Sequence, residues 1–310
     1  MKHILRSLRN FLLPPKVKFA DGDRLEKAEN YVERYREIVM DPLNILVNRV
    51  PNAGYIDQDG DVILCNGNSV AITGANSYYG SFSDILIINR GVHEPLEEYC
   101  FQTLLNTIKT DSPKMIELGA YWSHYSMWLS KDKPSAECVM VEPDAKNLEA
   151  GKRNFRKNGY EGEFIQKIVG EGGFKVDDFI DERSMAKLDI LHSDIQGFEV
   201  EMLDGARRAL EAKKIDYLFI STHSDQLHKE VQCKLESAGY LVEVSSGYSE
   251  HTTSMDGFIC ASSPLALRMF ENFSPLGRLE ILNSRSIDLV SYLGDVELNV
   301  GDKLISKETD

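Results

Sequence analysis

The stretch from residue 114 to residue 144 constrains the fold more than any other part of the chain. Residues 114–118 form an apolar run that ends at Gly119, residues 123–130 carry apolar side chains at helical spacing, and residues 138–141 form a second apolar run. This order predicts a strand, a glycine turn, a helix and a second strand. Glu142 follows the second strand, where a carboxylate can bind the two hydroxyls of a ribose. The alternative is an ordinary βαβ unit in which Gly119 only makes a tight turn.

The residues around Gly119 indicate which ribose-containing cofactor fits this turn. A pyrophosphate needs several glycines so that backbone N–H groups can approach it, but Ala120, Tyr121 and Trp122 follow Gly119 here. This crowding argues against NAD. S-adenosylmethionine has no phosphate and carries a sulfonium cation, which suits an acidic turn that contains Glu117. We therefore expect S-adenosylmethionine as the cofactor.

Later apolar runs extend the predicted sheet. Strands are expected near residues 164, 188 and 217, mostly separated by helices, and residues 240–244 with 257–260 are expected to form a closing pair. We predict an α/β fold with a doubly wound, mostly parallel sheet. The expected divisions are an N-terminal α+β cap over residues 1–92, a sheet domain over 93–263 and a C-terminal extension over 264–310. One helix is expected over 198–212, and an acidic helix with a hairpin-like tail is expected in the extension.

The predicted cap has three features of interest. A charged helix is expected over residues 23–40, and a hairpin over 54–64 with Asp59 and Gly60 at its turn. The polar and aromatic loop that contains Tyr78 and Tyr79 suits stacking against a sugar or a base, although a packed loop with two half-buried tyrosines explains it slightly better.

Polar side chains gather at the predicted carboxyl ends of the strands, where ligands bind in open α/β sheets. They are Glu117, Glu142, Asp194 and His223. Any one of them has a structural explanation, but four at one edge favour a binding site.

A second polar group surrounds the start of the helix expected to run to about residue 110. Glu97 and Glu98 are expected to face solvent and to interact with the helix dipole, which leaves His93 and Glu94 without that explanation. His192 lies on the same expected strand as Asp194, two residues away, and is either a site residue or a buried strand histidine.

Composition limits the partners. The formal charge is 35 − 49 = −14 without a basic face, which argues against nucleic acid. Five scattered cysteines without a Cys-x-x-Cys pair indicate reduced thiols and a cytoplasmic protein. We expect no transmembrane segment; the basic amphipathic pattern of residues 2–13 either docks on the protein or touches a membrane surface.

Three segments together resemble the FkbM-type S-adenosylmethionine-dependent methyltransferases. They are Ile116–Ala120 at the turn, Val141–Asp144 after the second strand with Asn154 in the next helix, and the run Ser193–Ala206. The resemblance covers about residues 91–263. The chain departs from the family pattern at Tyr121-Trp122-Ser123, where an asparagine and a second glycine are usual, and at Gln196, where an acidic residue is usual.

The resemblance implies a class I methyltransferase fold, which is Rossmann-like, and O-methylation of a sugar hydroxyl in a glycan, a glycolipid or a natural product. It implies cofactor contacts from Glu94, Glu117, Gly119, Ala120, Tyr121, Ser123, Glu142, Pro143 and Asp144. Expected substrate contacts are Tyr78, Tyr79, Gln196 and His251.

Methyl transfer to a hydroxyl is an in-line displacement that needs a base or a metal ion. His223 is the first choice for the base and His93 the second, with Asp194 in the same catalytic group. Alternatively, Asp194 and His223 bind a divalent ion such as Mg²⁺, with His192, Glu94 or His93 as further ligands.

Two other functions remain open at this stage. One is a non-catalytic module on the same fold that binds a carbohydrate or a partner, and the other is an NAD-dependent or nucleotide-sugar enzyme. In each case the expected ligand is a small molecule or a glycan, and the sequence does not indicate an oligomeric state.

Overall fold

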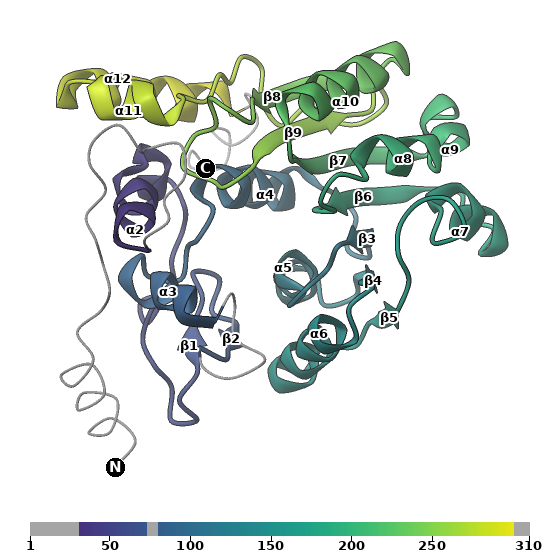
Figure 1. Cartoon of the computed structure of the whole chain (residues 1–310), viewed down its shortest axis with the longest axis horizontal. Coiled ribbons are helices and arrows are strands. Elements are labelled where there is room, and N and C mark those ends of the chain that lie inside the picture. Colours follow the sequence, from purple (N-terminus) through teal and green to yellow (C-terminus); the bar gives the residue numbers. More distant parts are fainter. Residues whose placement is uncertain (1–30, 73–79, 301–310) are drawn as a thin grey trace, which may run out of the picture.

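A seven-stranded sheet organises the computed structural model, which describes residues 31–72 and 80–300 (Figure 1). The strand order is β5-β4-β3-β6-β7-β9-β8. The bounds are β3 (Lys114–Leu118), β4 (Glu137–Val141), β5 (Glu163–Ile165), β6 (Leu188–Ser193), β7 (Ile215–Thr222), β8 (Leu241–Ser246) and β9 (Gly257–Ser262). Only β9 runs against the other six strands, because its pairs with β7 and β8 are antiparallel. The predicted class I, mostly parallel α/β fold and the closing strand pair are confirmed.

Helices cover both faces of this sheet (Figure 1). The helices on one face are α4 (Pro95–Thr107), α5 (His124–Asp132) and α6 (Ala145–Asn158). The other face is covered by α7 (Val176–Glu182), α8 (Glu199–Asp204), α9 (Arg207–Glu211) and α10 (Asp225–Ser237). Because successive strand residues point to opposite faces, Met115 joins the core under α4 and α5, whereas Ile116 joins the core under α7 to α10.

The N-terminal part packs on the face that carries α4 and α5. It contains α2 (Tyr31–Met40), η1 (Pro42–Ile45), β1 (Val62–Ile63), β2 (Ser69–Val70), η2 (Gly80–Asp84) and α3 (Ile85–Ile88). Side chains such as Leu43 and Val62 belong to the same core cluster as Phe101 of α4. One apolar core thus contains residues from both sides of the expected boundary at residue 92. The division into a cap and a sheet domain stays a prediction.

The predicted hairpin over residues 54–64 forms, but its pairing is too short to make two regular strands. The turn at Gly60 is present, Ile56 and Val62 form an antiparallel bridge, and the backbone N–H groups of Gly54 and Asp57 donate to the carbonyls of Ile63 and Asp61. The continuous pairing of Val62 and Ile63 is instead with Ser69 and Val70. The polar segment around Asp57 accepts hydrogen bonds from the backbone N–H groups of Asp59 and Asp61, which favours a turn over a long ladder.

Other expected boundaries change for local reasons. The helix expected over 198–212 is two short helices, α8 and α9, separated at Gly205 and Ala206. The sequence interpretation also missed α10, which Ser224 caps by accepting from the Leu227 N–H. The helix expected in the C-terminal extension is present as α11 (Arg278–Asn283) and α12 (Ser286–Asn299), and no hairpin occurs in this extension up to residue 300.

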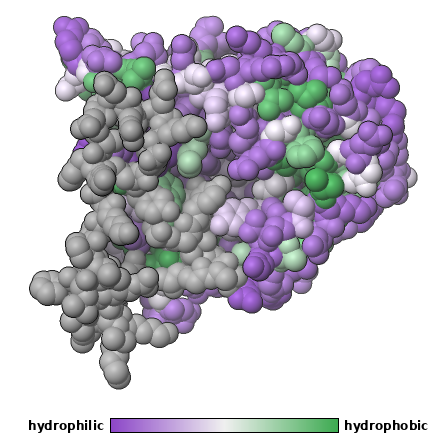
Figure 2. All heavy atoms as spheres, in the orientation of Figure 1, coloured by the Kyte–Doolittle hydropathy of each residue, from purple (hydrophilic) through white to green (hydrophobic). Residues whose placement is uncertain are grey.

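Some predictions lie outside the described residues. They concern the amphipathic pattern of residues 2–13, the first part of the expected 23–40 helix, and the loop with Tyr78 and Tyr79. Within the described residues, no helix is both long enough and apolar enough to cross a membrane. The face shown in Figure 2 is mostly hydrophilic with smaller apolar areas, in keeping with the charge of −14.

The ends of β3 and β6 approach each other closely at Gly119. The Asp194 N–H donates to the Leu118 carbonyl at 2.9 Å, and Gly119 has a φ of +70°. A Cβ at Gly119 would lie 1.8 Å from the Asp194 carbonyl oxygen. Glycine is therefore required here both for its backbone conformation and for space.

We predict that Gly119→Ala lowers the free energy of unfolding by more than about 2 kcal/mol, because left-handed strain adds to a backbone clash. Gly159→Ala is the matched control: Gly159 has a φ of +77°, and a Cβ added there would have no atom within 4 Å. The control should cost only about 1 kcal/mol. Urea unfolding of both variants makes the comparison, and equal losses would contradict the importance of the close approach.

Candidate active site

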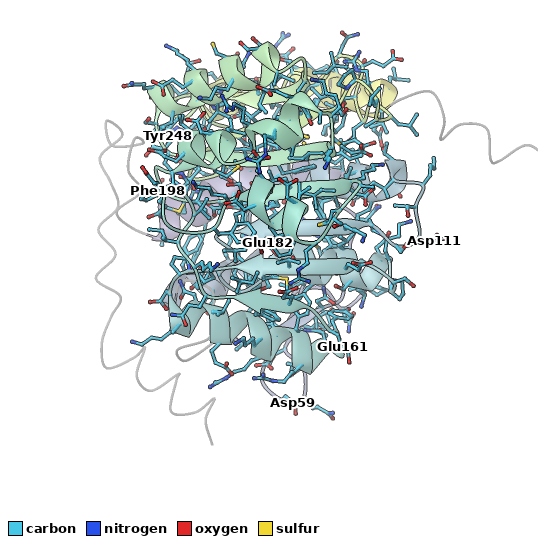
Figure 3. The ribbon with its side chains drawn as sticks, turned by 90° about the vertical axis from the view of Figure 1, so that its right-hand side faces the viewer. Asp59, Asp111, Glu161, Glu182, Phe198 and Tyr248 are labelled. Atoms are coloured by element: carbon cyan, nitrogen blue, oxygen red, sulfur yellow. The ribbon has the colours of Figure 1, made fainter. Side chains whose placement is uncertain are left out.

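A cavity of about 500 Å³ opens at the carboxyl ends of β3, β4 and β6. Its lining residues are Gly119, Tyr121, Glu142, Pro143, Asn147, Ile168, Val169, Asp194, Ile195, Gln196 and Phe198. Figure 3 shows the two ends of the sheet: Phe198 and Tyr248 lie on the side where the parallel strands end, and Asp111 lies on the side where β3 begins. Ligands of open α/β sheets bind at the former side.

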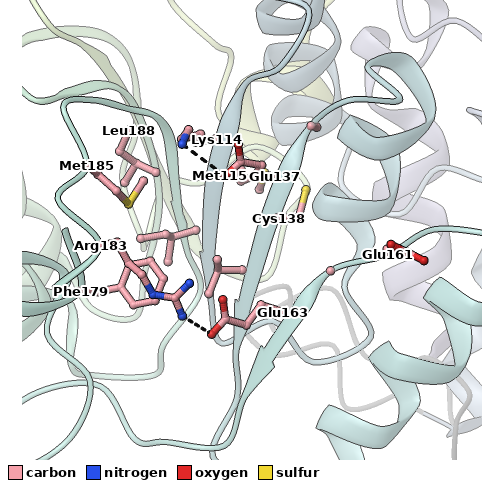
Figure 4. A pocket seen from close by; sticks show the side chains of 14 residues that line it. Lys114, Met115, Glu137, Cys138, Glu161, Glu163, Phe179, Arg183, Met185 and Leu188 are labelled. Atoms are coloured by element: carbon pink, nitrogen blue, oxygen red, sulfur yellow. Dashed lines mark hydrogen bonds and ion pairs between the residues drawn. The ribbon is translucent and has the colours of Figure 1, made fainter.

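A second cavity, of about 480 Å³, lies near the amino ends of β3, β4 and β6 (Figure 4). Four of its charged side chains form two ion pairs: Arg183 contacts Glu163 at 2.6 Å, and Lys114 contacts Glu137 at 3.3 Å. Since most of its charges are paired and it lies away from the carboxyl ends, we assign the candidate site to the first cavity.

Glu142 stabilises the turn that forms one wall of the first cavity. Its Oε2 accepts from the Tyr121 N–H at 3.1 Å, and its Oε1 accepts from the Asp144 N–H at 2.9 Å. Tyr121 has a φ of +41°, a conformation that costs energy for a residue other than glycine. Burial raises the pKa of Glu142, although the two backbone hydrogen bonds lower it. The carboxylate has further lone pairs for ligand hydroxyls.

Four other predicted cofactor residues, Glu117, Ala120, Ser123 and Asp144, do not line the cavity. Glu117 is buried, and its Oε2 accepts from the Ser126 N–H at 3.0 Å in α5. Ser123 is the N-cap residue of α5, while Asp144 caps α6 by accepting from the Lys146 and Asn147 N–H groups, which lower its pKa. Ala120 is buried and donates its N–H to the Val141 carbonyl. Of the predicted cofactor residues, Gly119, Tyr121, Glu142 and Pro143 line the cavity.

Asp194 extends from the cavity into a cluster with His223 and Asp256. His223 Nε2 lies 3.4 Å from Asp194 Oδ1 and 3.6 Å from Asp256 Oδ1. On its other side, His223 Nδ1 makes a short contact with Oε1 of Glu199, which is fully buried. One ligand atom each from Asp194, His223 and Asp256 lies within 4.8 Å of the others. The predicted meeting of Asp194 and His223 is thus observed.

The carboxylates around His223 determine its protonation. Burial alone would lower the pKa of His223, but its contacts with Asp194 and Glu199 and the charge of Asp256 raise it to about 10. The pKa of Asp256 is raised to about 6 by burial, against the effect of His223. His223 therefore carries a proton at neutral pH unless another cation takes its place.

The N-terminal part helps to hold the loop that carries Asp256. Asp41 Oδ2 accepts from the Thr253 hydroxyl at 2.7 Å, and Arg34 donates to the Ser254 carbonyl at 3.1 Å. Neither Asp256 nor Glu199 was assigned a role from the sequence. A signal for Asp256 exists: it precedes β9, and the start of an antiparallel strand lies at the carboxyl edge of its parallel neighbours.

Glu97 and Glu98 are buried, so the expectation that they face solvent is wrong. Glu97 Oε1 contacts His192 Nε2 at 2.6 Å, and Glu98 Oε1 accepts from the His93 N–H at 2.9 Å. His192 is thus the buried strand histidine that was one of its two interpretations. The α4 start packs against the sheet, and therefore its acidic residues bond to buried polar groups instead of water.

His93 and Glu94 lie together at the start of α4. His93 Nδ1 lies 2.6 Å from Glu98 Oε1, and its Nε2 lies 3.4 Å from Glu94 Oε2. Burial raises the pKa of Glu94 to about 8, and the charges of Glu97 and Asp194 act in the same direction while His93 opposes them. Neither residue lines the cavity, and His93 bonds to a different carboxylate from His223.

The predicted substrate residues are separated in space. Gln196 lines the cavity. His251 is buried beside Arg278 and Arg34, and burial together with these two charges lowers its pKa to about 4. His251 is thus neutral at physiological pH.

Comparison with protein families supports the assignment of class. Residues 173–242, which include β6, α8, α9, β7 and α10, match the family described as "Methyltransferase FkbM domain". This match identifies a methyltransferase. The match confirms the predicted relationship of the chain to the FkbM-type methyltransferases. No curated protein matches the chain significantly.

Solved structures with a similar arrangement are remote in sequence. A precorrin-6y C5,15-methyltransferase from Geobacter metallireducens is 16% identical over 54% of this chain and 87% of its own, with a TM-score of 0.40. TrmK from M. capricolum, in complex with S-adenosyl-homocysteine, is 16% identical over 63% of this chain and 81% of its own, with a TM-score of 0.38.

We predict that His223 of the metal-free protein titrates well above its ordinary pKa of 6.5, at about 10. Because the folded-state pKa is raised, the resulting stability is fully present below pH 6.5 and is lost as the pH rises through about 10. Glu199→Gln should lower the His223 pKa. NMR titration of ¹³C-labelled histidine measures it, with His228, whose pKa burial lowers, as the internal control. An unchanged His223 pKa in the variant would contradict the role of Glu199.

Proposed function

We propose that the protein transfers a methyl group from S-adenosylmethionine to a hydroxyl of a glycan, a glycolipid or a natural product, with a divalent cation at Asp194, His223 and Asp256. The observation that carries this proposal is the position of Asp194. It lines the cavity beside Glu142 and also belongs to the His223 cluster. A cofactor in the cavity and an acceptor at the cluster would therefore meet at Asp194.

The residues of the cavity fit S-adenosylmethionine. Two backbone N–H groups bond to Glu142, and its remaining lone pairs can accept from the ribose hydroxyls. Ile168 and Phe198 provide exposed apolar surface for the adenine, and the turn from Gly119 to Tyr121 is left for the amino-acid end. The cofactor supplies a methyl group on a sulfonium cation, and the carboxylates of Glu142 and Asp194 suit that positive charge.

The geometry of the cluster favours a cation over a histidine base. Glu199 faces Nδ1, so the N–H of a neutral His223 is at Nδ1 and the Nε2 lone pair faces two carboxylates. Such an arrangement is repulsive unless Nε2 carries a proton, which prevents His223 from acting as a base, or a cation lies between the three groups. Two atoms bound to one ion at about 2.1 Å are roughly 3–3.5 Å apart, close to the 3.4 and 3.6 Å seen here. Two carboxylates and an imidazole suit Mg²⁺ or Mn²⁺.

Each residue then has one task. Asp194, His223 and Asp256 hold the cation, and Glu199 orients the His223 ring, as outer carboxylates do for metal-bound histidines. When bound, the cation lowers the pKa of a coordinated hydroxyl. Neighbouring hydroxyls of a sugar can occupy two positions on one ion, which supports a sugar acceptor. The side chain of Asp194 is 40% exposed, so the acceptor can enter from solvent and its proton can leave to water.

The first test is calorimetric titration with S-adenosylmethionine and S-adenosylhomocysteine, with NAD as a control. We expect binding of the first two only. Glu142→Gln should weaken cofactor binding about tenfold or more, because a hydrogen bond to a charged group contributes about 1.5–3 kcal/mol. Glu163→Gln, at the rim of the other cavity, is the matched control and should not change the affinity. Unchanged affinity in a folded Glu142→Gln protein would refute the ribose contact.

The cation is tested with Mn²⁺, whose binding is followed by electron paramagnetic resonance. Asp256→Asn should weaken Mn²⁺ binding about tenfold or more and slow methyl transfer, while cofactor affinity stays close to wild type. Asp225→Asn is the control, because Asp225 is an exposed carboxylate that bonds to Ser249. Methyl transfer to a panel of sugars that survives exhaustive chelation would exclude an essential cation and return His223 or His93 to consideration as the base.

A further inference from the structure

A second group of metal-ligating side chains lies between α4 and α5. It consists of His93, Glu98 and His124, whose ligand atoms, one from each residue, all lie within 4.8 Å of one another. His93 and His124 are each 3% exposed and Glu98 is fully buried. This cluster is therefore closed to solvent, unlike the group formed by Asp194, His223 and Asp256.

His124 lacks the hydrogen bonds that a buried histidine needs. Neither of its ring nitrogens has a hydrogen-bond partner among the described residues, and Nε2 lies 3.8 Å from Glu98 Oε1, too far for a hydrogen bond. Its ring stacks on Trp122, with centroids 5.0 Å apart, and meets His93 edge-on at 4.8 Å. These contacts pack the His124 ring, but they leave both of its buried ring nitrogens without a hydrogen bond. A buried polar atom without a hydrogen bond costs free energy, and a ligand bound to one nitrogen would lower that cost.

The groups around the cluster are those of a supported metal site. Oε1 of Glu98 accepts from the backbone N–H of His93 at 2.9 Å and from that of Glu94 at 3.3 Å, which fixes the carboxylate. His93 Nε2 faces Glu94 Oε2 at 3.4 Å, which leaves Nδ1 toward Glu98. Metal-bound histidines commonly donate their second N–H to a carboxylate in this way.

A thiol lies beside the same carboxylate. Cys65 is 1% exposed, and its Sγ lies 3.4 Å from Glu98 Oε2. Two imidazoles, one carboxylate and one thiolate form a ligand set that suits Zn²⁺, and structural zinc sites are closed and four-coordinate.

We propose that His93, Glu98 and His124 bind a structural Zn²⁺, with Cys65, which contacts Glu98 Oε2 but lies outside the 4.8 Å group in this structure, as the fourth ligand. Binding displaces the proton between His93 and Glu98 and the thiol proton of Cys65, and both protons leave to solvent. The site joins the segment after β1 to the starts of α4 and α5. It thereby anchors the N-terminal part to the sheet. This inference does not depend on the proposed methyl transfer.

The test is the metal content of the full-length protein, purified with zinc present and dialysed against EDTA. We expect about one zinc per chain that dialysis does not remove, because the ligands are buried. His124→Phe keeps an aromatic ring beside Trp122 but has no nitrogen, so it should lose the zinc and keep Mn²⁺ binding at Asp194. Asp256→Asn is the matched control and should keep the zinc. Wild-type protein without zinc, or a His124→Phe variant with as much zinc as wild type, would overturn the proposal.

Cobalt substitution tests the fourth ligand without relying on the stability of the histidine variant. Protein refolded with Co²⁺ should show the visible bands of a tetrahedral site and a thiolate-to-cobalt charge-transfer band. Cys65→Ser should lose the charge-transfer band. A tetrahedral cobalt spectrum in the wild type without this band would rule out Cys65, and the absence of a tetrahedral spectrum would rule out the site.

Discussion

The approach of the β3 and β6 ends at Gly119 determines where the chemistry of this protein can occur. The Asp194 N–H bonds to Leu118, and the Asp194 carbonyl occupies the space that any side chain at residue 119 would need. This contact places Asp194 beside the turn that Glu142 stabilises. The cavity and the His223 cluster adjoin because both include Asp194.

Carboxylates are used for two purposes in this structure. Glu142, Glu117 and Glu98 accept backbone N–H groups and thereby stabilise turns or helix starts. Asp194, Asp256 and Glu199 instead surround the single imidazole of His223. Carboxylates of the first kind bond to backbone N–H groups, whereas those of the second kind leave a local excess of negative charge that a cation can neutralise.

The two proposed cation sites differ in the properties that decide which metal binds. The group at Asp194 has two carboxylates and access to solvent, which suits an exchangeable ion that contacts an acceptor. The group at His124 has two imidazoles and is buried, which suits a structural ion that does not exchange while the protein is folded. His93 belongs to the second group because it contacts Glu98. The neighbouring residue of the same helix, Glu97, instead contacts His192 of the sheet.

The sequence by itself determined the parallel sheet, the glycine turn and the edge at which Glu142, Asp194 and His223 lie, because hydrophobic periodicity and glycine positions are local properties of the chain. Only the tertiary structure decided which polar groups meet. Asp256 reaches His223 because β9 inserts antiparallel between β7 and β8, and Glu98 and His124 meet because α4 and α5 pack together. Such contacts join residues far apart in sequence, and their burial, which made Glu97 and Glu98 core residues, depends on packing that no local pattern reports.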